Sequence, residues 1–199
     1  MAKTVTPATA RGERTRQKLL SAAEEEFGEN GFYSASISNI TRRAGVAQGT
    51  FYIYFESKEE ILRALVAHMS REMRRAQSEA TAHCNNRIEA ERAGFRRFLR
   101  FALEHRNLYR IVMQSQFVDR AVHRDYYDTL LRGYERRIAD AQGRGEVRAG
   151  DPRALAWALI GMAYFFGMRY ASWEGRLPDE AAIETVLDFM EAGLRPESP

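Results

Sequence analysis

The sequence contains a single cysteine, Cys84, among its 199 residues. One cysteine cannot form an intramolecular disulfide framework or a cysteine-based zinc cluster, so we expect a cytoplasmic protein. The N-terminal segment MAKTVTPATARGERTR has no apolar stretch of the kind that marks a secretory signal. The longest uncharged run, residues 154–168, has 15 residues, fewer than the roughly 20 that a membrane span needs. We therefore predict that it forms a buried helix, and we expect no membrane partner.

Proline is scarce. Pro7 and Pro152 have no proline between them, and each of the five prolines lies in a tail or where a helix could begin. Apolar residues recur at helical spacing through this stretch, and no convincing alternating strand pattern appears. We predict an all-α protein with helices near 13 to 30, 37 to 44, 48 to 54, 58 to 81, 86 to 104, 107 to 115, 119 to 142, 152 to 173 and 179 to 193.

Catalytic constellations are missing as well. No nucleophile with a base, no paired carboxylates and no metal-ligand set can be recognised, and we interpret the acidic run at residues 24–26 as a solvated helix face. The four histidines lie at spacings that build no metal pair along a helix. We therefore expect no enzyme, no metal site and no cofactor. Lys and Arg number 30 against 27 Asp and Glu, so only the distribution of charge can indicate a nucleic-acid partner.

Residues 36–55, SISNITRRAGVAQGTFYIYF, have the pattern of a helix-turn-helix motif. A serine can cap the first short helix, and Gly45 supplies the tight turn before the second. In such a motif the second helix enters the major groove with its N-terminus first. Gln48, Gly49 and Thr50 are therefore expected at base edges, where Gln can pair with adenine and Thr can contact a thymine methyl group.

Aromatic and basic residues follow the motif closely. Phe51 and Phe55 lie four residues apart and are expected to pack inward, whereas Tyr52 and Tyr54 are expected to turn their hydroxyls toward phosphates. Lys58 begins the next helix, where its charge and the free N–H groups would form an anion site. The basic cluster comprises Arg11, Arg14, Arg16, Lys18, Arg42 and Arg43.

Residues 15–62 resemble the DNA-binding domain of the TetR family of bacterial regulators. The motifs that carry the resemblance are Ala44-Gly45-Val46, Gly49-Thr50-Phe51-Tyr52, Tyr54-Phe55 and Ser57-Lys58-Glu59-Glu60, within about a quarter of the chain. The DNA contacts that it implies are Ser38, Arg42, Gln48, Gly49, Thr50, Tyr52, Tyr54 and Lys58. Asn39 stands where the family often has an acidic residue, and we expect it to leave the second helix slightly less well capped.

The resemblance further implies that the remaining helices hold a ligand cavity and form a homodimer. Residues 154–168 are apolar on two opposite faces, so one face can line the core while the other meets a partner; which face does which is left open. The candidate dimer interface comprises Leu155, Leu159, Met162, Phe166, Ile183, Val186, Leu187 and Met190. The candidate ligand pocket comprises Phe98, Phe101, Tyr109, Met113, Phe117, Tyr126, Tyr127, Tyr134, Phe165 and Arg169.

The ligand expected from this aromatic and methionine content is a small apolar or aromatic effector. Arg106, Arg110 and Arg169 leave open an anionic head group or an acyl-coenzyme A. We expect a tail at 1–10, a helix-turn-helix DNA-binding domain at 11–57, a ligand-binding and dimerisation domain at 58–195 and a tail at 196–199.

The function expected from this organisation is ligand-responsive transcriptional regulation. Repression by a homodimer on a palindromic operator in double-stranded DNA, with release by the effector, is the leading hypothesis. A helical adaptor or small-molecule-binding protein without DNA binding is the alternative, although it would leave Gln48, Thr50 and Tyr54 without a role. The operator sequence, the regulated genes and the choice between repressor and activator do not follow from the sequence.

Overall fold

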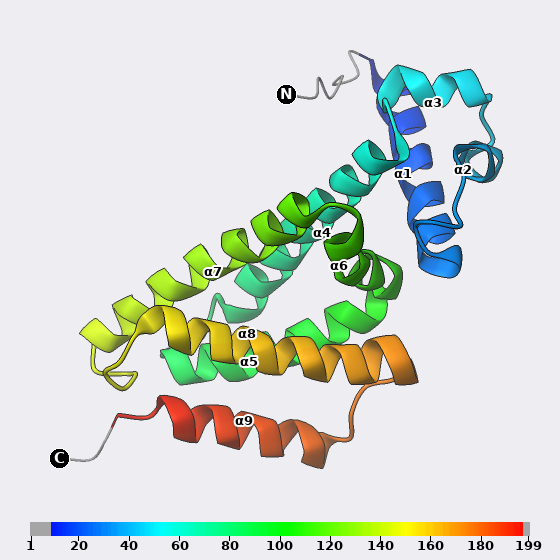
Figure 1. The fold of residues 1–199 in the computed structure, drawn as a ribbon. Coiled ribbons are helices and arrows are strands. Elements are labelled where there is room, and N and C mark those ends of the chain that lie inside the picture. Colours follow the sequence, from blue (N-terminus) through cyan, green and yellow to red (C-terminus); the bar gives the residue numbers. More distant parts are fainter. Residues whose placement is uncertain (1–8, 197–199) are drawn as a thin grey trace. The chain divides into compact units, whose positions relative to one another are not determined.

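The computed structural model describes residues 9–196, and the regular structure within them is entirely helical (Figure 1). Contacts divide the chain into two compact units. The first combines the described residues up to Met69 with Asn107–Tyr126, and the second combines Ser70–Arg106 with the described residues from Tyr127 onward. The elements are α1 (Ala10–Asn30), α2 (Ile37–Ala44), α3 (Gln48–Tyr54), α4 (Lys58–Thr81), α5 (Arg87–Glu104), α6 (Arg106–Val118), α7 (Arg120–Gly143), α8 (Pro152–Gly167), the π-helix η1 (Met168–Glu174) and α9 (Glu180–Leu194).

The predicted all-α class is confirmed, and α2, α3 and α4 have the predicted bounds. Helix α1 begins three residues earlier than predicted, because Thr9 accepts a hydrogen bond at its Oγ1 from the Gly12 N–H at 3.1 Å and so caps the helix. Apart from Thr9, Ala10 and Pro196, the tails predicted at 1–10 and 196–199 lie outside the described residues. The boundary predicted between residues 57 and 58 stays a prediction.

Helices α1, α2 and α3 of the first unit pack around aromatic side chains. Phe27 and Phe51 are completely buried, and the Phe27 ring centroid lies 5.3 Å from that of Phe32. Gly45 adopts φ 66°, and its N–H donates to the Arg42 carbonyl. This left-handed conformation is easy only for glycine, which confirms the predicted turn between α2 and α3.

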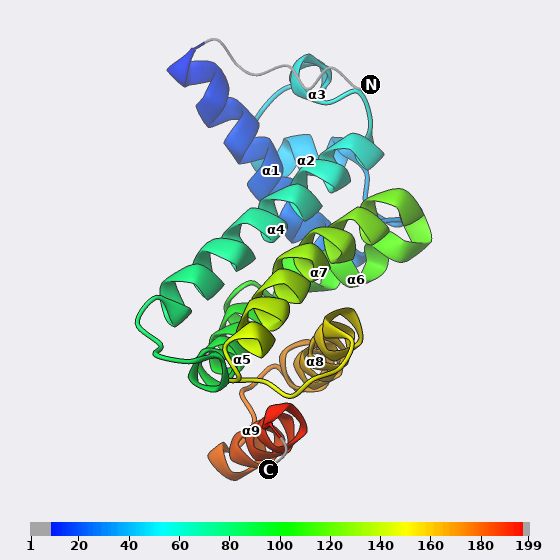
Figure 2. The same cartoon turned by 90° about the vertical axis from the view of Figure 1, so that its left-hand side faces the viewer.

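In the second unit, α8 and α9 run antiparallel and pack against α5 (Figures 1 and 2). Their shared core contains Phe95 and Leu99 from α5, Leu159 from α8, and Leu187 and Met190 from α9. All eight candidate dimer residues are either buried in this core or packed against it. These residues therefore line the side of α8 and α9 that faces the core of the single chain, and their role in a partner interface stays a prediction.

Some large apolar side chains of α8 and α9 lie outside this core and are exposed. Trp157 and Phe165 of α8 are 41% and 64% exposed, and Phe189 of α9 is 70% exposed. Residues 152–174 are long and apolar enough to cross a membrane by length and composition, and only 28% of their most apolar window is buried. The prediction of a buried helix at residues 154–168 was thus right for one side of the helix only.

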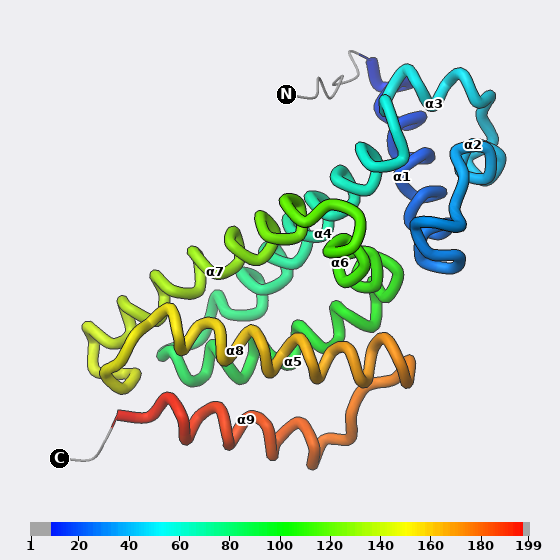
Figure 3. The backbone as a smooth tube through the Cα atoms, in the orientation of Figure 1, coloured from blue at the N-terminus to red at the C-terminus, as the bar shows by residue number. Residues whose placement is uncertain are grey.

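The end of α8 differs from the continuous helix predicted to residue 173. After Gly167 the chain continues as the π-helix η1 (Figure 3). This π-helix ends before Gly175, where φ is 67°. Arg106 donates to the Ser172 carbonyl at 2.8 Å, and its Nη1 would lie 3.0 Å from a Cβ atom placed on Gly175. Arg106 therefore supports this turn.

Candidate nucleic-acid interface

Helix α3 presents one side to solvent and buries the other. Gln48 and Gly49 are exposed, and Tyr52 is 54% exposed, whereas Phe51 and Phe55 are 0% and 1% exposed. The rings of Phe51 and Phe55 pack with centroids 5.7 Å apart, so the predicted inward pair is confirmed. This buried pair anchors the helix and leaves its outer side free to meet a partner.

Ile53 was missed by the sequence analysis. It is 61% exposed and lies four residues after Gly49, so it shares the outer side of α3. That spacing was the signal that could have revealed it. A branched aliphatic side chain on a surface facing the major groove can contact thymine methyl groups, as apolar side chains do in direct readout.

The predicted backbone contacts Ser38 and Arg42 are both exposed on α2. The helix begins after Ser36, whose Oγ accepts from the Asn39 N–H at 3.1 Å. The Asn39 side chain also donates to Glu26 Oε1 at 2.9 Å and accepts from Arg42 at 2.9 Å. The cap expected to be weaker is therefore present, and Asn39 additionally ties α2 to α1.

Glu26 corrects the interpretation of residues 24–26 as a solvated face, since it is 1% exposed. Arg43 Nε donates to its Oε2 at 2.8 Å, and Arg43 also pairs with Glu29 at 2.5 Å. Burial by itself would raise the pKa of Glu26, but the hydrogen bonds from Asn39 and Arg43 outweigh it and lower that pKa. Arg43 is thus neutralised within the domain and adds little to the basic cluster around α2.

Lys58 lies half-buried at the start of α4, and its ammonium is already bound. Its Nζ donates to the carbonyls of Phe32 and Ala35 at 2.7 and 2.8 Å and, more weakly, to that of Tyr33 at 3.4 Å. The same ammonium lies 4.5 Å from the Phe32 ring centroid. An ammonium has three donors, so Lys58 holds the loop between α1 and α2. A phosphate contact by Lys58 stays a prediction that competes with this anchoring role.

The other two predicted contacts on α3 lie deeper than Gln48. Thr50 is half-buried and its N–H donates to the Ala47 carbonyl at 2.9 Å. Tyr54 is half-buried in the last turn of the helix. The predicted contacts on α3 therefore differ in exposure: Gln48 is exposed, whereas Thr50 and Tyr54 are partly covered.

The ten candidate pocket residues are divided between the two compact units, four in the first and six in the second. Phe101 and Tyr109 are 2% and 5% exposed, whereas Phe117 and Phe165 are 73% and 64% exposed. Phe98 and Tyr134 pack against the α5, α8 and α9 core. The Tyr127 ring centroid lies 6.3 Å from that of Trp157 in a tilted arrangement and 6.2 Å from that of Tyr164 in an edge-on arrangement. Met113 and Tyr126 are half-buried. The cavity as a whole stays a prediction.

The three arginines suggested for an anionic head group are bound within the chain. Arg106 supports η1 as described above, Arg110 donates to the Gly28 carbonyl at 3.2 Å, and Arg169 pairs with Glu174 at 3.0 Å. Two of these guanidinium groups thus contact backbone carbonyls, and that of Arg169 contacts a carboxylate. Within residues 9–196 no group of three His, Cys, Asp or Glu side chains is arranged to hold a metal ion.

The model of the family "Bacterial regulatory proteins, tetR family" matches residues 19–65, the segment that contains α2 and α3. Residues 19–65 therefore form an N-terminal domain of the TetR-family type. This family comprises regulatory proteins, which agrees with the expectation that the chain is not an enzyme.

Two curated relatives from Bacillus subtilis illustrate the match. An HTH-type transcriptional regulator, YdgC, is 39% identical over 66 residues, which are 33% of this chain and 34% of that protein. A fatty acid metabolism regulator protein is 46% identical over 48 residues, 24% of this chain and 25% of that protein. The matched segments thus span about a quarter to a third of these relatives, so they support the N-terminal domain alone.

Solved structures extend the likeness of fold to nearly the whole chain. The transcriptional regulator FadR from Bacillus subtilis, in complex with stearoyl-CoA, superposes with a TM-score of 0.78 at 22% identity, over 89% of this chain and 98% of that one. A TetR family transcription regulator from Marinobacter aquaeolei VT8 gives 0.74 at 20% identity, over 92% and 97%. At these identities the likeness shows the fold.

Proposed function

We propose that the chain is a ligand-responsive TetR-family transcriptional repressor that binds a palindromic operator as a homodimer. The observation that carries the proposal is the outer side of α3, where Gln48, Gly49, Tyr52 and Ile53 lie exposed on a helix whose other side is fixed by buried aromatic residues. The proposal keeps the DNA-binding domain at 11–57 and the ligand-binding and dimerisation domain at 58–195.

Each exposed residue has a distinct proposed task at the DNA. Gln48 pairs with a base edge, and Gly49 lets the backbone approach the groove. Ile53 contacts a thymine methyl group, while Tyr52 and the α2 residues Ser38 and Arg42 contact phosphates. Thr50 and Tyr54, which are partly covered, add hydroxyls at the edge of this surface.

The proposed homodimer is formed by the outer face of α8 and α9. Trp157, Phe165 and Phe189 are large apolar side chains that a monomer would leave in water, and an isologous interface could bury them against a second copy. Covering this face also accounts for the apolar character of residues 152–174 without a membrane. We place the dimer in the cytoplasm.

The proposed effector is a small apolar or aromatic molecule that favours a conformation unable to place two α3 helices in successive major grooves, about 34 Å apart. An acyl-coenzyme A is a second candidate, supported by the stearoyl-CoA bound to FadR of Bacillus subtilis. Since that likeness is one of fold, the candidate must be tested directly. Thermal shifts with aromatic acids and acyl-coenzyme A esters would rank the two classes, and a true effector must also release DNA.

Selection of bound sequences from a random duplex library tests the DNA-binding function. The full-length chain is expected to enrich an inverted repeat, and gel shifts with that repeat should show one dimer per duplex. A pool without enrichment would contradict the proposal and favour the helical adaptor. The enriched sequence would also locate the operator in a source genome.

A further inference from the structure

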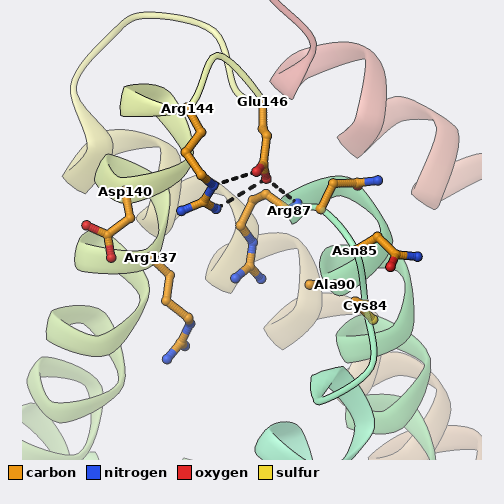
Figure 4. Close-up of a pocket in the computed structure, with 9 residues that line it drawn as sticks. Cys84, Asn85, Arg87, Ala90, Arg137, Asp140, Arg144 and Glu146 are labelled. Carbon is orange, nitrogen blue, oxygen red and sulfur yellow. Dashed lines mark hydrogen bonds and ion pairs between the residues drawn. The ribbon is translucent and has the colours of Figure 1, made fainter.

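An open cavity of about 290 Å³ lies in the second unit, where the turn before α5 meets the end of α7 (Figure 4). Three arginines line it: Arg87 from the first turn of α5, Arg137 from α7, and Arg144 from the loop after α7. Two acidic residues, Asp140 and Glu146, also line it. Sequence analysis gave this group of residues no role in binding.

Glu146 already places a carboxylate in the wall of this cavity. Its Oε2 accepts from the Arg87 backbone N–H at 2.6 Å, and its Oε1 accepts from Arg144 Nε at 2.5 Å. The hydrogen bond from Arg144, followed by the one from the Arg87 N–H, lowers the pKa of Glu146. The first N–H of α5 and the Arg144 guanidinium therefore form a binding site for an oxyanion, and the Glu146 carboxylate occupies that site.

The guanidinium groups of Arg87 and Arg137, near Glu146, lack some of the hydrogen-bond partners that they could bind. The Arg87 side chain is 91% buried and pairs with Glu91 at 2.5 Å, but its Nε has no hydrogen-bond partner among the described residues. The Tyr134 hydroxyl donates to the same Glu91 at 2.5 Å. Arg137 has no carboxylate partner within residues 9–196. One buried carboxylate thus faces two guanidinium groups and a phenol.

The two guanidinium groups flank the same ring, with Arg87 at 5.7 Å and Arg137 at 5.3 Å from the Tyr134 centroid. Loss of hydration and the like charge of Arg87 lower the pKa of Arg137. Asp140, the remaining acid of the cavity, points away from both guanidinium groups (Figure 4). This corner of the cavity therefore carries excess positive charge.

We propose that the cavity binds the oxyanion group of a small ligand, a carboxylate or a phosphate, on Arg137 and Arg87. A planar guanidinium fork matches both groups. The volume is at the small end for ligand pockets, which fits a small anion or the charged end of a longer molecule. Glu146 binds neighbouring donors, the Arg87 backbone N–H and Arg144 Nε, and its negative charge in the same cavity lowers the affinity for a second anion. This inference concerns ligand binding alone and stands whether or not the chain binds DNA.

Calorimetric titration of the full-length chain with inorganic phosphate and with acetate, in chloride buffer of constant ionic strength, tests the proposal. At least one anion should bind saturably below roughly 10 mM, and the one that binds more tightly identifies the source of the oxyanion. Arg137→Gln should weaken that binding at least tenfold. Arg136→Gln is the matched control, because it removes the same charge from the adjacent exposed position on α7 and should change the affinity less than twofold.

Two further variants keep the test decisive. Arg137→Lys keeps the charge but loses the fork, and should bind less tightly than the wild type and more tightly than Arg137→Gln. Glu146→Gln should bind at least threefold more tightly, because the variant removes a negative charge from the cavity that holds the anion. Binding no stronger than that of chloride, equal losses in Arg136→Gln and Arg137→Gln, or no tightening in Glu146→Gln would each overturn the proposal.

Discussion

Replacing Lys58 by Met separates two roles for this side chain, an anchor for the loop between α1 and α2 and a phosphate contact. The change keeps an unbranched apolar side chain, one atom shorter, and removes the ammonium. Two hydrogen bonds to carbonyls at 2.7 and 2.8 Å are lost. Hydrogen bonds that involve a charged group contribute about 1.5 to 3 kcal/mol each. Because Lys58 is half-exposed and water can reach the carbonyls, we take the lower figure and expect a loss of about 3 kcal/mol.

Urea unfolding of the full-length chain measures this loss, with Lys18→Met as the matched control. Lys18 is exposed, so its replacement removes the same charge and should change the free energy of unfolding by less than about 0.5 kcal/mol. At equal slope, a loss of 3 kcal/mol moves the midpoint by about 1 to 3 M urea. The salt dependence of DNA binding supplies the second readout.

The anchoring role predicts lower stability and an unchanged salt slope for Lys58→Met. If Lys58 contacts a phosphate in each half-site, the slope should instead fall by about two units, because each phosphate contact contributes about 0.9. A variant as stable as Lys18→Met with a flatter slope would refute the anchoring argument.

Three other predictions follow from the same structure. Glu26→Gln should cost about 1.5 to 3 kcal/mol, because the charged hydrogen bond from Arg43 is lost. The pKa of Glu26 is lowered in the folded chain, so the wild type should lose this advantage as the pH falls through that pKa, and the stabilities of the two proteins should converge in acid. Phe189→Glu should give a folded monomer in light scattering, whereas the wild type should have twice the 22.8 kDa mass of one chain. A Phe189→Glu dimer would disprove the proposed interface. Leu187→Ala, which changes the buried core, should lower the free energy of unfolding by about 2 to 5 kcal/mol. Replacing one operator thymine by uracil should weaken wild-type binding by about 0.8 kcal/mol, the contribution of one buried methyl group, and should not affect Ile53→Ala; equal effects on both proteins would remove Ile53 from the groove.

The helices could be predicted well from the sequence because the residues that start and end them act locally. Ser36 and Gly45 act within a few residues of themselves, as does Asp151, whose side chain accepts from the Arg153 N–H at 2.9 Å. The inward pair Phe51 and Phe55 follows from spacing alone. These features required no knowledge of which helices pack together.

Features that depend on distant residues escaped prediction. Glu26 resembles its acidic neighbours in sequence, and its burial depends on Asn39 and Arg43 of another helix. The apolar residues of α8 surround the helix, so spacing could not decide which side meets α5 and α9. Lys58 was interpreted from its place at a helix start, whereas its partners are carbonyls more than twenty residues earlier.

The central claim is that α3 reads DNA sequence, and its most direct test is the affinity ratio between the selected operator and a scrambled duplex at one salt concentration. Fluorescence anisotropy should give a ratio of about 10³ or more for the wild type. Gln48→Ala should lower that ratio at least tenfold while leaving the affinity for the scrambled duplex unchanged, because a base contact is lost and the phosphate contacts remain. Equal affinity of the wild type for both duplexes would contradict the account.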